Sequence, residues 1–474
     1  MAEAQKFSRL TLTAMVVGSM VGAGIFSLPA RFGAATGPFG AIVAWLIAGG
    51  GMLMLAFVFQ SLAVRKPAID AGIFAYAKEG FGNYLGFAAA FGFWIGTCLG
   101  NTTYFVLIKS TLGAFFPVFG DGNTPTAVIV SSIILWAFHF TILRGIKEAA
   151  FINQVVTVAK ILPIFVFIAF VAFAFDYELF LASFWGGGDY SGSQVFDQVR
   201  STMLVTVFVF IGIEGASVYS RYAKRREDVG WATVMGFVGV LCLLVLVTLL
   251  PYGVLERPEL GALRQPSMAG ALEHVVGAWG LKFVSIGLIV SVLGAFLAWS
   301  LLAAEVLYSS AKYGLVPKMF AHENKHQVPS AALWITNILV QLFLIVSIFS
   351  QYAFDLSLEM TSALTLIPYT LVAGYALKLV LTRETYEPGS KGLGRDMTIA
   401  GIAVVYTFFM LLSGGLKHLV LACILLAPGT ILFVLSRREQ RARLFTGWEL
   451  GLLGVFILGA AAGIYGLATG MITI

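Results

Sequence analysis

The sequence has few charged residues. Only 11% of its 474 residues are Asp, Glu, Lys or Arg, whereas soluble domains carry about 25%. Hydrophobic residues make up 59% of the chain, and this balance excludes a soluble globular domain. Apolar runs of about 20 residues recur along the whole length, which is the length that a helix needs to cross a bilayer. A transmembrane β-barrel would instead show short alternating segments. The composition therefore predicts an all-α polytopic membrane protein.

Cysteines and clustered metal ligands are also scarce. Cys98, Cys242 and Cys423 lie singly in apolar runs, so neither a disulfide nor a metal site is expected. The five histidines are scattered, and no nucleophile–base pair, nucleotide-binding loop or HExxH motif is present. We therefore predict no cofactor and no enzyme activity. The net charge of +6 comes without a dense basic block, so nucleic acid is not an expected partner. A channel is disfavoured because the charges form no repeated ring.

Hydropathy predicts thirteen membrane-spanning helices, separated by short loops. If the N-terminus is cytoplasmic, 22 of the 30 lysines and arginines fall on the cytoplasmic side, as the positive-inside rule requires. The odd number of spans then places Ile474 outside. The only sizeable external connections are residues 176–197 and 253–277. The predicted helices are 10–30, 39–63, 84–116, 125–143, 152–175, 198–220, 230–252, 278–310, 331–350, 357–381, 397–414, 417–435 and 448–471.

The first apolar run is weakened by glycine. The stretch GSMVGAGIF, residues 18–26, contains Gly18, Gly22 and Gly24, although each glycine costs a helix interior roughly 1 kcal/mol relative to alanine. The run is followed by many further spans, so it is not a cleavable signal peptide. Close helix packing through Gly18-x-x-x-Gly22 is one explanation. A deliberate break in the helix is the other.

A second weak point favours the break. FIGIEGASV, residues 210–218, places two glycines around Glu214 in the sixth predicted helix. Interrupted helices at corresponding positions of two halves are typical of inverted-repeat secondary transporters. Unwound turns free peptide N–H and C=O groups that can bind a carboxylate and an ammonium at mid-membrane.

These motifs resemble the amino acid–polyamine–organocation superfamily. GSMVGAGIFSLPA and FIGIEGASVYS carry the resemblance, together with Gly100-Asn101, AWSLLAAE (298–305), YGLVPKMFAHENKHQVP (313–329) and TLIPY (365–369). Among its members the chain is most similar to basic amino acid/polyamine antiporters of the arginine:ornithine type. The resemblance implies a five-plus-five inverted-repeat fold with discontinuous first and sixth helices. Helices 1–5 and 6–10 are the expected repeats of a core at residues 1–440, which helices 11 and 12 complete. Residues 441–474 add a thirteenth helix.

The resemblance also implies a main-chain site for a zwitterion. The substrate carboxylate is expected at Gly22, Ala23 and Gly24. Its α-ammonium is expected at carbonyls near Met20 and Ile211. Related exchangers often carry serine where Ala23 stands, so this chain leaves the carboxylate to backbone groups.

Two of the charges inside predicted spans are candidate functional residues. Glu214 matches the gating or proton-linked acid of the antiporters, and a carboxylate at a helix centre costs roughly 2.5–3.5 kcal/mol. The alternative is a structural cap on the broken-helix amides. Lys160, in TVAKILP, matches a lysine that replaces sodium in sodium-independent members. Snorkelling is the alternative, although Lys160 lies about 12 Å along the helix from Ile152 at the cytoplasmic start.

Side chains from other helices are expected to complete the site. Trp299 matches an aromatic gate, and Phe208 stands where relatives carry a tryptophan lid, unless it is ordinary core packing. Thr97, Asn101 and Tyr104 share one face of the third helix, which lines the side-chain pocket in the resemblance. Thr361 is an expected hydrogen-bond partner of the substrate. Glu305 and Glu359 rank lower, because each could pair with a lysine instead.

The predicted function is exchange of L-arginine for L-ornithine across the bacterial inner membrane by alternating access. Arginine/agmatine exchange, lysine/cadaverine exchange and proton-coupled amino-acid uptake remain open. A membrane amino-acid sensor is the alternative outside transport, disfavoured by the short loops. The expected partners are small cationic amino acids, the lipid bilayer and a second copy in a homodimer.

Overall fold

The computed structural model describes residues 9–69, 72–145, 149–186, 191–214, 226–350, 352–386 and 392–473. Every regular element in these ranges is helical. The α-helices are α1 (Arg9–Met20), α2 (Leu28–Ala35), α3 (Pro38–Arg65), α4 (Ile73–Phe81), α5 (Asn83–Gly113), α6 (Pro125–Leu143), α7 (Ala149–Phe173), α8 (Tyr177–Ala182), α9 (Gly192–Phe210), α11 (Arg226–Leu249), α12 (Arg257–Ala262), α13 (Ser267–Val276), α14 (Ala278–Lys312), α15 (Ser330–Val346), α16 (Ala353–Thr382), α17 (Leu393–Ser413), α18 (Gly415–Glu439) and α19 (Gly447–Ala468). The 3₁₀ segments are η1 (Ala23–Ser27), η2 (Pro117–Phe119), η4 (Leu250–Gly253), η5 (Lys318–Ala321) and η6 (Ser347–Phe349).

The predicted spans are recovered as helices. Within the described residues, ten helices are long and apolar enough to cross a membrane, and α1 with η1–α2 forms an eleventh, broken span bent by 47°. The other two predicted spans correspond to α7, whose apolar part is Ala159–Phe173, and to α9, which ends at Phe210. The polytopic all-α prediction is confirmed, and the number thirteen stays a prediction.

The connections contain helices that hydropathy did not predict. The expected loop 176–197 holds α8, and the expected loop 253–277 holds α12 and α13. These helices are six to ten residues long, too short to register as spans. Local capping was the available signal for α8, because the Asp176 carboxylate accepts hydrogen bonds from the N–H groups of Glu178 and Leu179.

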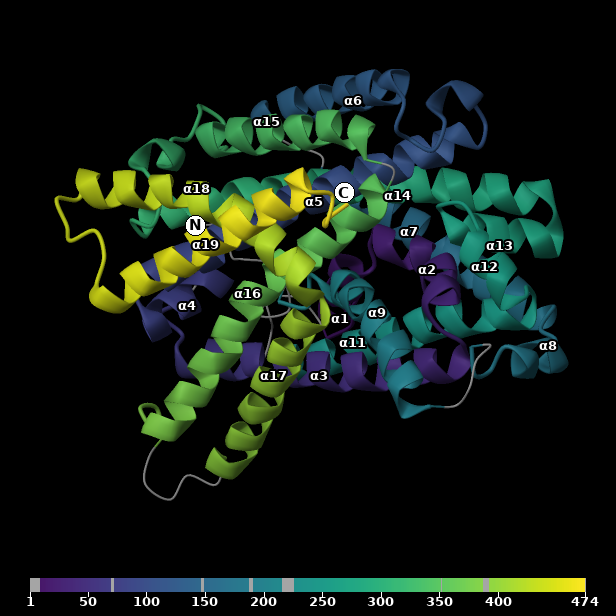
Figure 1. Cartoon of the computed structure of the whole chain (residues 1–474), viewed down its shortest axis with the longest axis horizontal. Helices are drawn as coiled ribbons and strands as arrows, with labels where there is room; N and C mark the ends of the chain where they lie inside the picture. The colour runs from purple at the N-terminus through teal and green to yellow at the C-terminus, as the bar shows by residue number, and fades with distance from the viewer. Residues whose placement is uncertain are drawn as a thin grey trace. The chain divides into compact units, whose positions relative to one another are not determined.

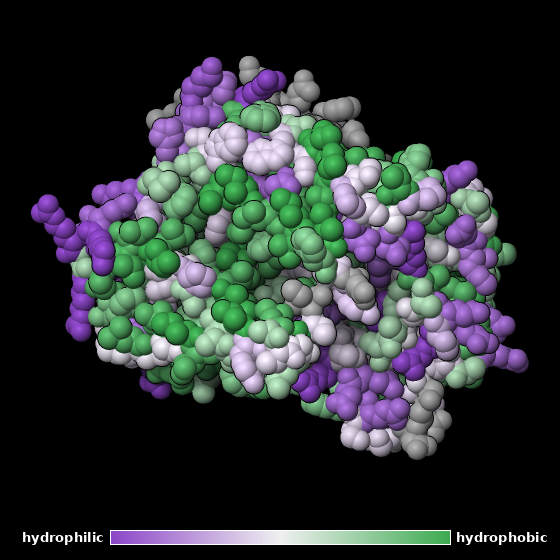
Figure 2. Space-filling model, turned by 45° about the horizontal axis from the view of Figure 1, so that its top comes forward, coloured by the Kyte–Doolittle hydropathy of each residue, from purple (hydrophilic) through white to green (hydrophobic). Residues whose placement is uncertain are grey.

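The exterior is apolar, as a lipid-facing surface requires. Figure 2 shows wide areas of hydrophobic residues, with hydrophilic residues gathered toward the margins of this face. Large apolar side chains are strongly exposed on several spans, among them Ile133, Phe173, Val405 and Leu458. A surface of this size would be an aggregation hazard in water, so it marks the part of the chain that contacts lipid tails.

The chain divides into two compact units. The first comprises Met1–Gln60, Leu107–Gly122 and Glu148–Ala295, and the second comprises Ser61–Val106, Asn123–Lys147 and Phe296–Ile474. The division does not follow the expected repeats, because α3, α5 and α14 each contribute to both units. Both interrupted spans, α1–η1–α2 and α9, belong to the first unit.

A column of aromatic rings forms the core of the first unit. Phe32 of α2 stacks on Trp45 of α3 with ring centroids 5.3 Å apart. Trp45 meets Phe210 at the end of α9 edge-on at 6.0 Å, and Phe210 stacks on Phe237 of α11 at 5.1 Å. This packing fixes the second half of the first span against the end of α9.

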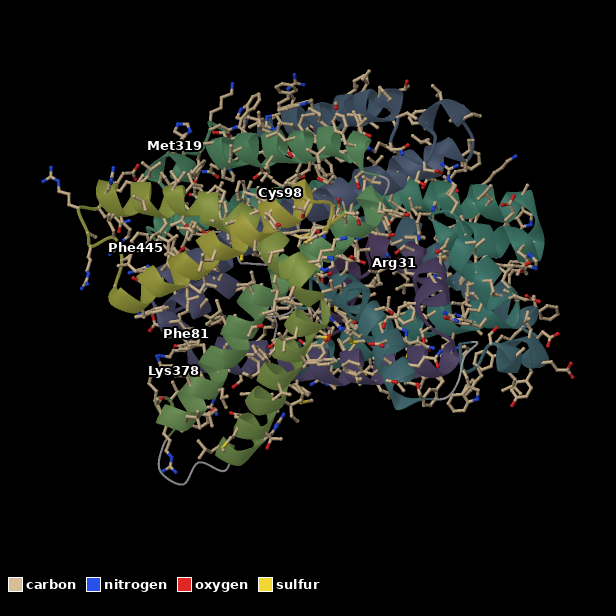
Figure 3. All side chains as sticks on the ribbon, viewed as in Figure 1. Arg31, Phe81, Cys98, Met319, Lys378 and Phe445 are labelled. Carbon is tan, nitrogen blue, oxygen red and sulfur yellow. The ribbon has the colours of Figure 1, made fainter. Side chains whose placement is uncertain are left out.

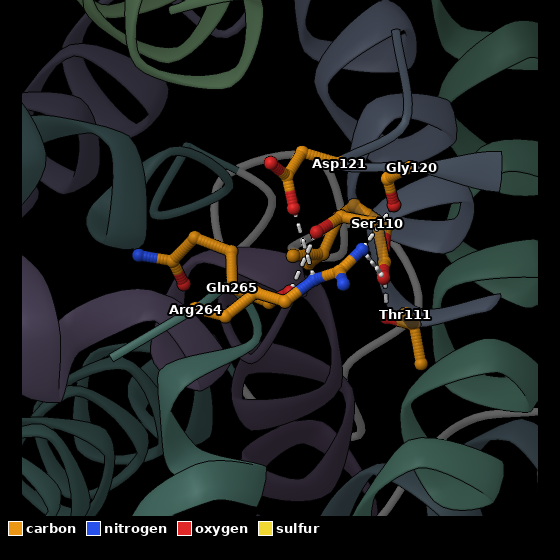
Figure 4. A network of polar contacts seen from close by, with 7 residues as sticks. Ser110, Thr111, Gly120, Asp121, Arg264 and Gln265 are labelled. Carbon is orange, nitrogen blue, oxygen red and sulfur yellow. Dashed lines mark hydrogen bonds and ion pairs between the residues drawn. The ribbon is translucent and has the colours of Figure 1, made fainter. Parts of the chain in front are cut away.

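Two arginines, one at the start of α12 and one just after its end, bond to the C-terminal ends of other helices in the first unit. Arg257 donates to the carbonyls of Gly33 and Ala34 at the C-terminus of α2. Arg264 donates to the Ser110 carbonyl at 2.9 Å and pairs with Asp121 at 3.3 Å, as Figure 4 shows. Carbonyls at a helix C-terminus lack intrahelical donors and carry partial negative charge, so arginine is a fitting cap.

The second unit is built on α5, α16 and the C-terminal helices. In Figure 1, α16 runs beside α17, and α18 runs beside α19. Glycines let α18 and α19 approach closely, since a Cβ on Gly459 would lie 2.6 Å from the sulfur of Cys423. Lys378 of α16 donates to the Gly80 carbonyl of α4 and lies beside the Phe81 ring (Figure 3).

Candidate functional site

The first break separates α1 from η1. The last regular bond of α1 runs from the Val21 N–H to the Val17 carbonyl, and Gly22 is extended with φ −123° and ψ −157°. The helix resumes at Ala23 in a direction bent by 47°. The carbonyls of Ser19 and Met20 are the last of α1, so no residue of the same helix donates to them. The predicted interruption of residues 18–26 is therefore confirmed.

The second break follows α9. The helix ends at Phe210, Ile211 is extended with φ −59° and ψ 131°, and Gly212 has φ +109°. This positive φ is costly for any residue but glycine. The Gly212 N–H donates to Oε2 of Glu214 at 3.1 Å. The predicted helix 198–220 thus ends ten residues early within the described residues, and Gly215 to Ser220 lie outside them.

The two breaks touch each other. A Cβ on Gly24 would lie 2.6 Å from Val209 and 2.8 Å from Phe208, so only glycine allows η1 to lie this close to α9. A Cβ on Gly212 would lie 2.5 Å from the Ser19 carbonyl oxygen. Ser19 Oγ also donates to the Gly212 carbonyl at 3.1 Å. Ser19 and Gly212, 193 positions apart, are therefore in direct contact.

Close packing does not explain every glycine of the first span. A Cβ on Gly18 would meet nothing within 4 Å among the described residues. Packing through Gly18 is thus not supported, whereas Gly24 lies in the contact between the breaks. The close packing through Gly18-x-x-x-Gly22 that the sequence suggested as an alternative thus has no support at Gly18.

Lys160 is buried and bonded to the first span. Its side chain is 8% exposed, and Nζ donates to the Gly18 carbonyl at 3.0 Å. On either side of it along α7, Val156 and Pro163 pack against glycines of α14, since a Cβ on Gly294 or Gly287 would overlap them. Because Nζ is engaged at the end of α1, Lys160 does not snorkel to a membrane surface. Helix α7 therefore links α1 to the first part of α14.

The remaining main-chain candidates lie at the two breaks. Met20, Ala23 and Gly24 are buried in the first, and Phe208 and Ile211 are buried at the second. Glu214 is also buried, with its carboxylate turned back onto the Gly212 amide. The first unit thus brings together the predicted groups of the first and sixth spans.

Several residues that were predicted to line the side-chain pocket lie in the second unit. Gly96 and Gly100 of α5 pack against Thr361 of α16, with a Cβ on Gly100 only 3.4 Å from the Thr361 methyl group. Asn101 is fully buried, and its Nδ2 donates to Ser300 Oγ at 3.3 Å. Its Oδ1 has no hydrogen-bond partner among the described residues. A buried acceptor without a donor suits a ligand that brings N–H groups.

Other predicted residues of the second unit have local partners. Thr97 and Thr361 each donate to the carbonyl four residues earlier in their own helix, at Phe93 and Ser357. Tyr104 is buried, and Trp299 is half-buried next to Ser300.

The two lower-ranked acids differ from each other. Glu305 is exposed and accepts a bond from Ser309 on its own helix. Glu359 lies 2.9 Å from Nε2 of His418. Glu359 therefore has a histidine partner that the sequence did not predict.

Sequence reasoning missed two polar residues of interest. Ser19, inside the quoted stretch, bridges the breaks. Lys109 of α5 is only 1% exposed, and it stands in the apolar run VLIKSTL. The signal that singled out Lys160, a cation within an apolar span, was equally present at Lys109.

This arrangement defines a class of protein. A helical membrane protein whose first span is broken, and packs at the break against the broken end of a later span, is a secondary transporter of the inverted-repeat kind. Residues 7–424 match the amino acid permease family. The chain belongs to this family, within the amino acid–polyamine–organocation superfamily.

Its relatives are named as transporters of cationic amino acids. The chain is 50% identical to an arginine/ornithine antiporter of Pseudomonas aeruginosa, over 99% of each protein. It is 40% identical to an L-lysine transport protein of Corynebacterium glutamicum, over 100% of this chain and 97% of the relative. It is 37% identical to an arginine/agmatine antiporter of Chlamydia pneumoniae, over 98% and 97%.

A solved structure supports the fold. MhsT in complex with L-phenylalanine matches 87% of this chain and 100% of its own, with a TM-score of 0.59 and 16% sequence identity. This likeness confirms the predicted inverted-repeat transporter fold as the overall fold of the chain. The residues of each repeat and the domain limits of 440 and 441 stay predictions.

Proposed function

We propose that the protein exchanges L-arginine for L-ornithine across the bacterial inner membrane by alternating access. The observation that carries the proposal is the direct contact between the two breaks, at Ser19 with Gly212 and at Gly24 with Phe208. Peptide dipoles at such breaks can bind a zwitterion without any charged side chain. The arginine/ornithine relative at 50% identity supports the choice of substrates.

The zwitterionic end of the substrate binds at the first unit. Its carboxylate is held by the backbone of Gly22, Ala23 and Gly24. Its α-ammonium meets carbonyls near Met20 and Ile211, where α1 and α9 have ended. These contacts are common to arginine and ornithine, so they allow one site to carry either.

The cationic side chain binds at the α5–α16 contact. Asn101 Oδ1 accepts an N–H of the guanidinium or ammonium, and its burial without a partner supports this role. Thr97, Tyr104 and Thr361 complete the pocket wall. Phe208 of the first unit and Trp299 of the second are the proposed aromatic contacts of the substrate, since an aromatic ring attracts a cation.

Glu214 senses the bound cation. Its carboxylate is buried at the second break, and a bound cation attracts an acidic group. Glu214 thereby couples occupancy to the Gly212 turn, whose amide it accepts. Glu305 and Glu359 are left with subordinate roles along the access path.

Lys160 makes transport sodium-independent. Its ammonium is bonded to the end of α1 and supplies the positive charge that a bound sodium ion supplies in other carriers of this fold. Exchange of one monovalent cation for another moves no net charge, so outward ornithine can drive inward arginine.

The protein is placed in the inner membrane with a cytoplasmic N-terminus, since this orientation puts most basic residues inside. With thirteen helices, the C-terminus is periplasmic. Two copies form a homodimer. These statements extend the finding that the chain is a multi-pass membrane protein.

Arginine/agmatine exchange is the second candidate, favoured by the relative of Chlamydia pneumoniae. Counterflow separates the two. Vesicles containing the purified chain are loaded with ornithine or agmatine, and uptake of radiolabelled arginine is followed. We expect uptake with internal ornithine and little with agmatine or empty vesicles. Uptake driven by a pH gradient alone, without internal substrate, would overturn the exchange mechanism.

A further inference from the structure

The hydroxyl of Ser19 lies between two carbonyl oxygens of different elements. Ser19 Oγ is 2.8 Å from the Val16 carbonyl of α1 and 3.1 Å from the Gly212 carbonyl of the second break. A serine hydroxyl has one proton, so it donates fully to only one of them at a time. The bond to Val16 is a local back-bond within the helix. The bond to Gly212 joins the two breaks.

Gly212 is held in place independently of this hydroxyl. The backbone of Gly212 packs against the Ser19 peptide, since a Cβ on Gly212 would lie 2.5 Å from the Ser19 carbonyl oxygen. The Gly212 N–H donates a hydrogen bond to the Glu214 carboxylate. Gly212 is buried. A buried carbonyl without a donor is unfavourable, so the Gly212 oxygen requires a partner whether or not a substrate is present.

We propose that Ser19 is a positioning residue. Without substrate, its hydroxyl donates a hydrogen bond to the Gly212 carbonyl. When the α-ammonium of the substrate donates to that carbonyl instead, the hydroxyl turns and donates to the Val16 carbonyl. This inference rests on the proposed function, which puts the ammonium at carbonyls beside Met20 and Ile211, the residue before Gly212. Ser19 keeps one hydrogen bond in both states.

The variant Ser19→Ala tests the proposal through affinity. In the empty variant the Gly212 carbonyl has lost its donor, whereas the bound ammonium restores one. The bound variant loses only a second bond to the Val16 carbonyl, which α1 already pairs, so the empty state is destabilised more and binding becomes tighter. We expect the Kd for L-arginine to fall by about fivefold, measured by equilibrium binding to the purified full chain in detergent. A purely structural serine would leave the Kd unchanged or raise it.

A second ligand isolates the ammonium. δ-Guanidinovaleric acid is arginine without its α-amino group, so it cannot replace the serine at Gly212. We expect Ser19→Ala to leave the Kd of this ligand unchanged. Equal tightening for both ligands would overturn the proposal, because the gain would then not depend on the ammonium.

Matched variants control for folding and for the loss of a hydroxyl. Ser131 of α6 is buried and donates to the Ala127 carbonyl at 2.8 Å, within its own helix. Ser131→Ala should keep the wild-type Kd. Ser19→Thr retains a hydroxyl and should also keep the wild-type Kd, whereas Ser19→Cys, a weaker donor, should give an intermediate Kd.

If the wild type fails to bind arginine, the proposed function fails. If it binds and Ser19→Ala does not tighten, the role of Ser19 alone is refuted.

Discussion

The ammonium of Lys160 donates a 3.0 Å hydrogen bond to the carbonyl of Gly18, two residues before the end of α1. The bond crosses from α7 to the first break and replaces a partner that the interrupted helix cannot supply. Lys160 therefore belongs to the machinery of the break, although it lies 142 positions from it in sequence.

Removing this ammonium should weaken the first break. In Lys160→Met the Gly18 carbonyl loses a buried, charge-assisted bond, which should cost about 1–3 kcal/mol of stability and most of the exchange activity. Thermal unfolding in detergent and counterflow measure the two effects. Lys282→Met, at an exposed lysine of α14, should behave as wild type. Wild-type exchange should persist when choline replaces sodium, and a sodium requirement would contradict the role given to Lys160.

Replacing Glu214 by a neutral residue should distinguish the role of its charge from that of its hydrogen bond to the Gly212 amide. Gln at this position keeps an oxygen for the Gly212 amide but has no proton to exchange. We expect Glu214→Gln to fold, to exchange about tenfold more slowly and to lose the pH dependence of the wild type. Glu273→Gln, at an exposed acid of α13, serves as control. Normal exchange across pH by the Gln variant would leave Glu214 as a structural cap only.

Two glycine substitutions should have opposite outcomes. Gly212→Ala places a Cβ 2.5 Å from the Ser19 oxygen at a φ of +109°, so it should destabilise the chain by about 1–3 kcal/mol and abolish exchange. Gly18→Ala meets nothing within 4 Å among the described residues and should be fully active. Both are read by counterflow and by unfolding temperature. An active Gly212→Ala would show that the second break is not fixed as described.

Alkaline pH should weaken the junction of α3, α16 and α17. The Arg65 guanidinium contacts Asp396 at 2.7 Å and covers the Tyr386 ring. Burial and the bond to Asp396 raise the pKa of Tyr386 to about 12. A hydrogen bond to Glu384 raises the pKa of Lys66.

The sign of the effect is the same for both groups. Above about pH 10 the unfolded chain releases the tyrosine proton while the folded chain retains it, so stability falls as pH rises toward 12. The Lys66 ion pair stabilises below its unfolded pKa of 10.5 and is lost as pH rises through the raised value. Unfolding temperature should decline over this range, and Tyr386→Phe should decline less steeply. Parallel curves for both proteins would contradict the assignment to Tyr386.

Local patterns were enough to predict the spans and the first break. Apolar run length located the helices, and the glycines of residues 18–26 marked the interruption, because both are properties of consecutive residues. The partners across the site were not predictable in this way. Ser19 meets Gly212 and Glu359 meets His418 over separations of 193 and 59 positions, and no periodicity relates them. The short helices α8, α12 and α13 were missed because hydropathy detects only runs long enough to span.

The most direct test is an experimental structure of the purified chain with L-arginine bound. We expect density for the amino acid between residues 20–24 and 208–212, with its carboxylate on the η1 side. Arginine bound away from both interruptions, or a continuous α-helix through either of them in the loaded carrier, would contradict the claim that exposed peptide groups hold the substrate.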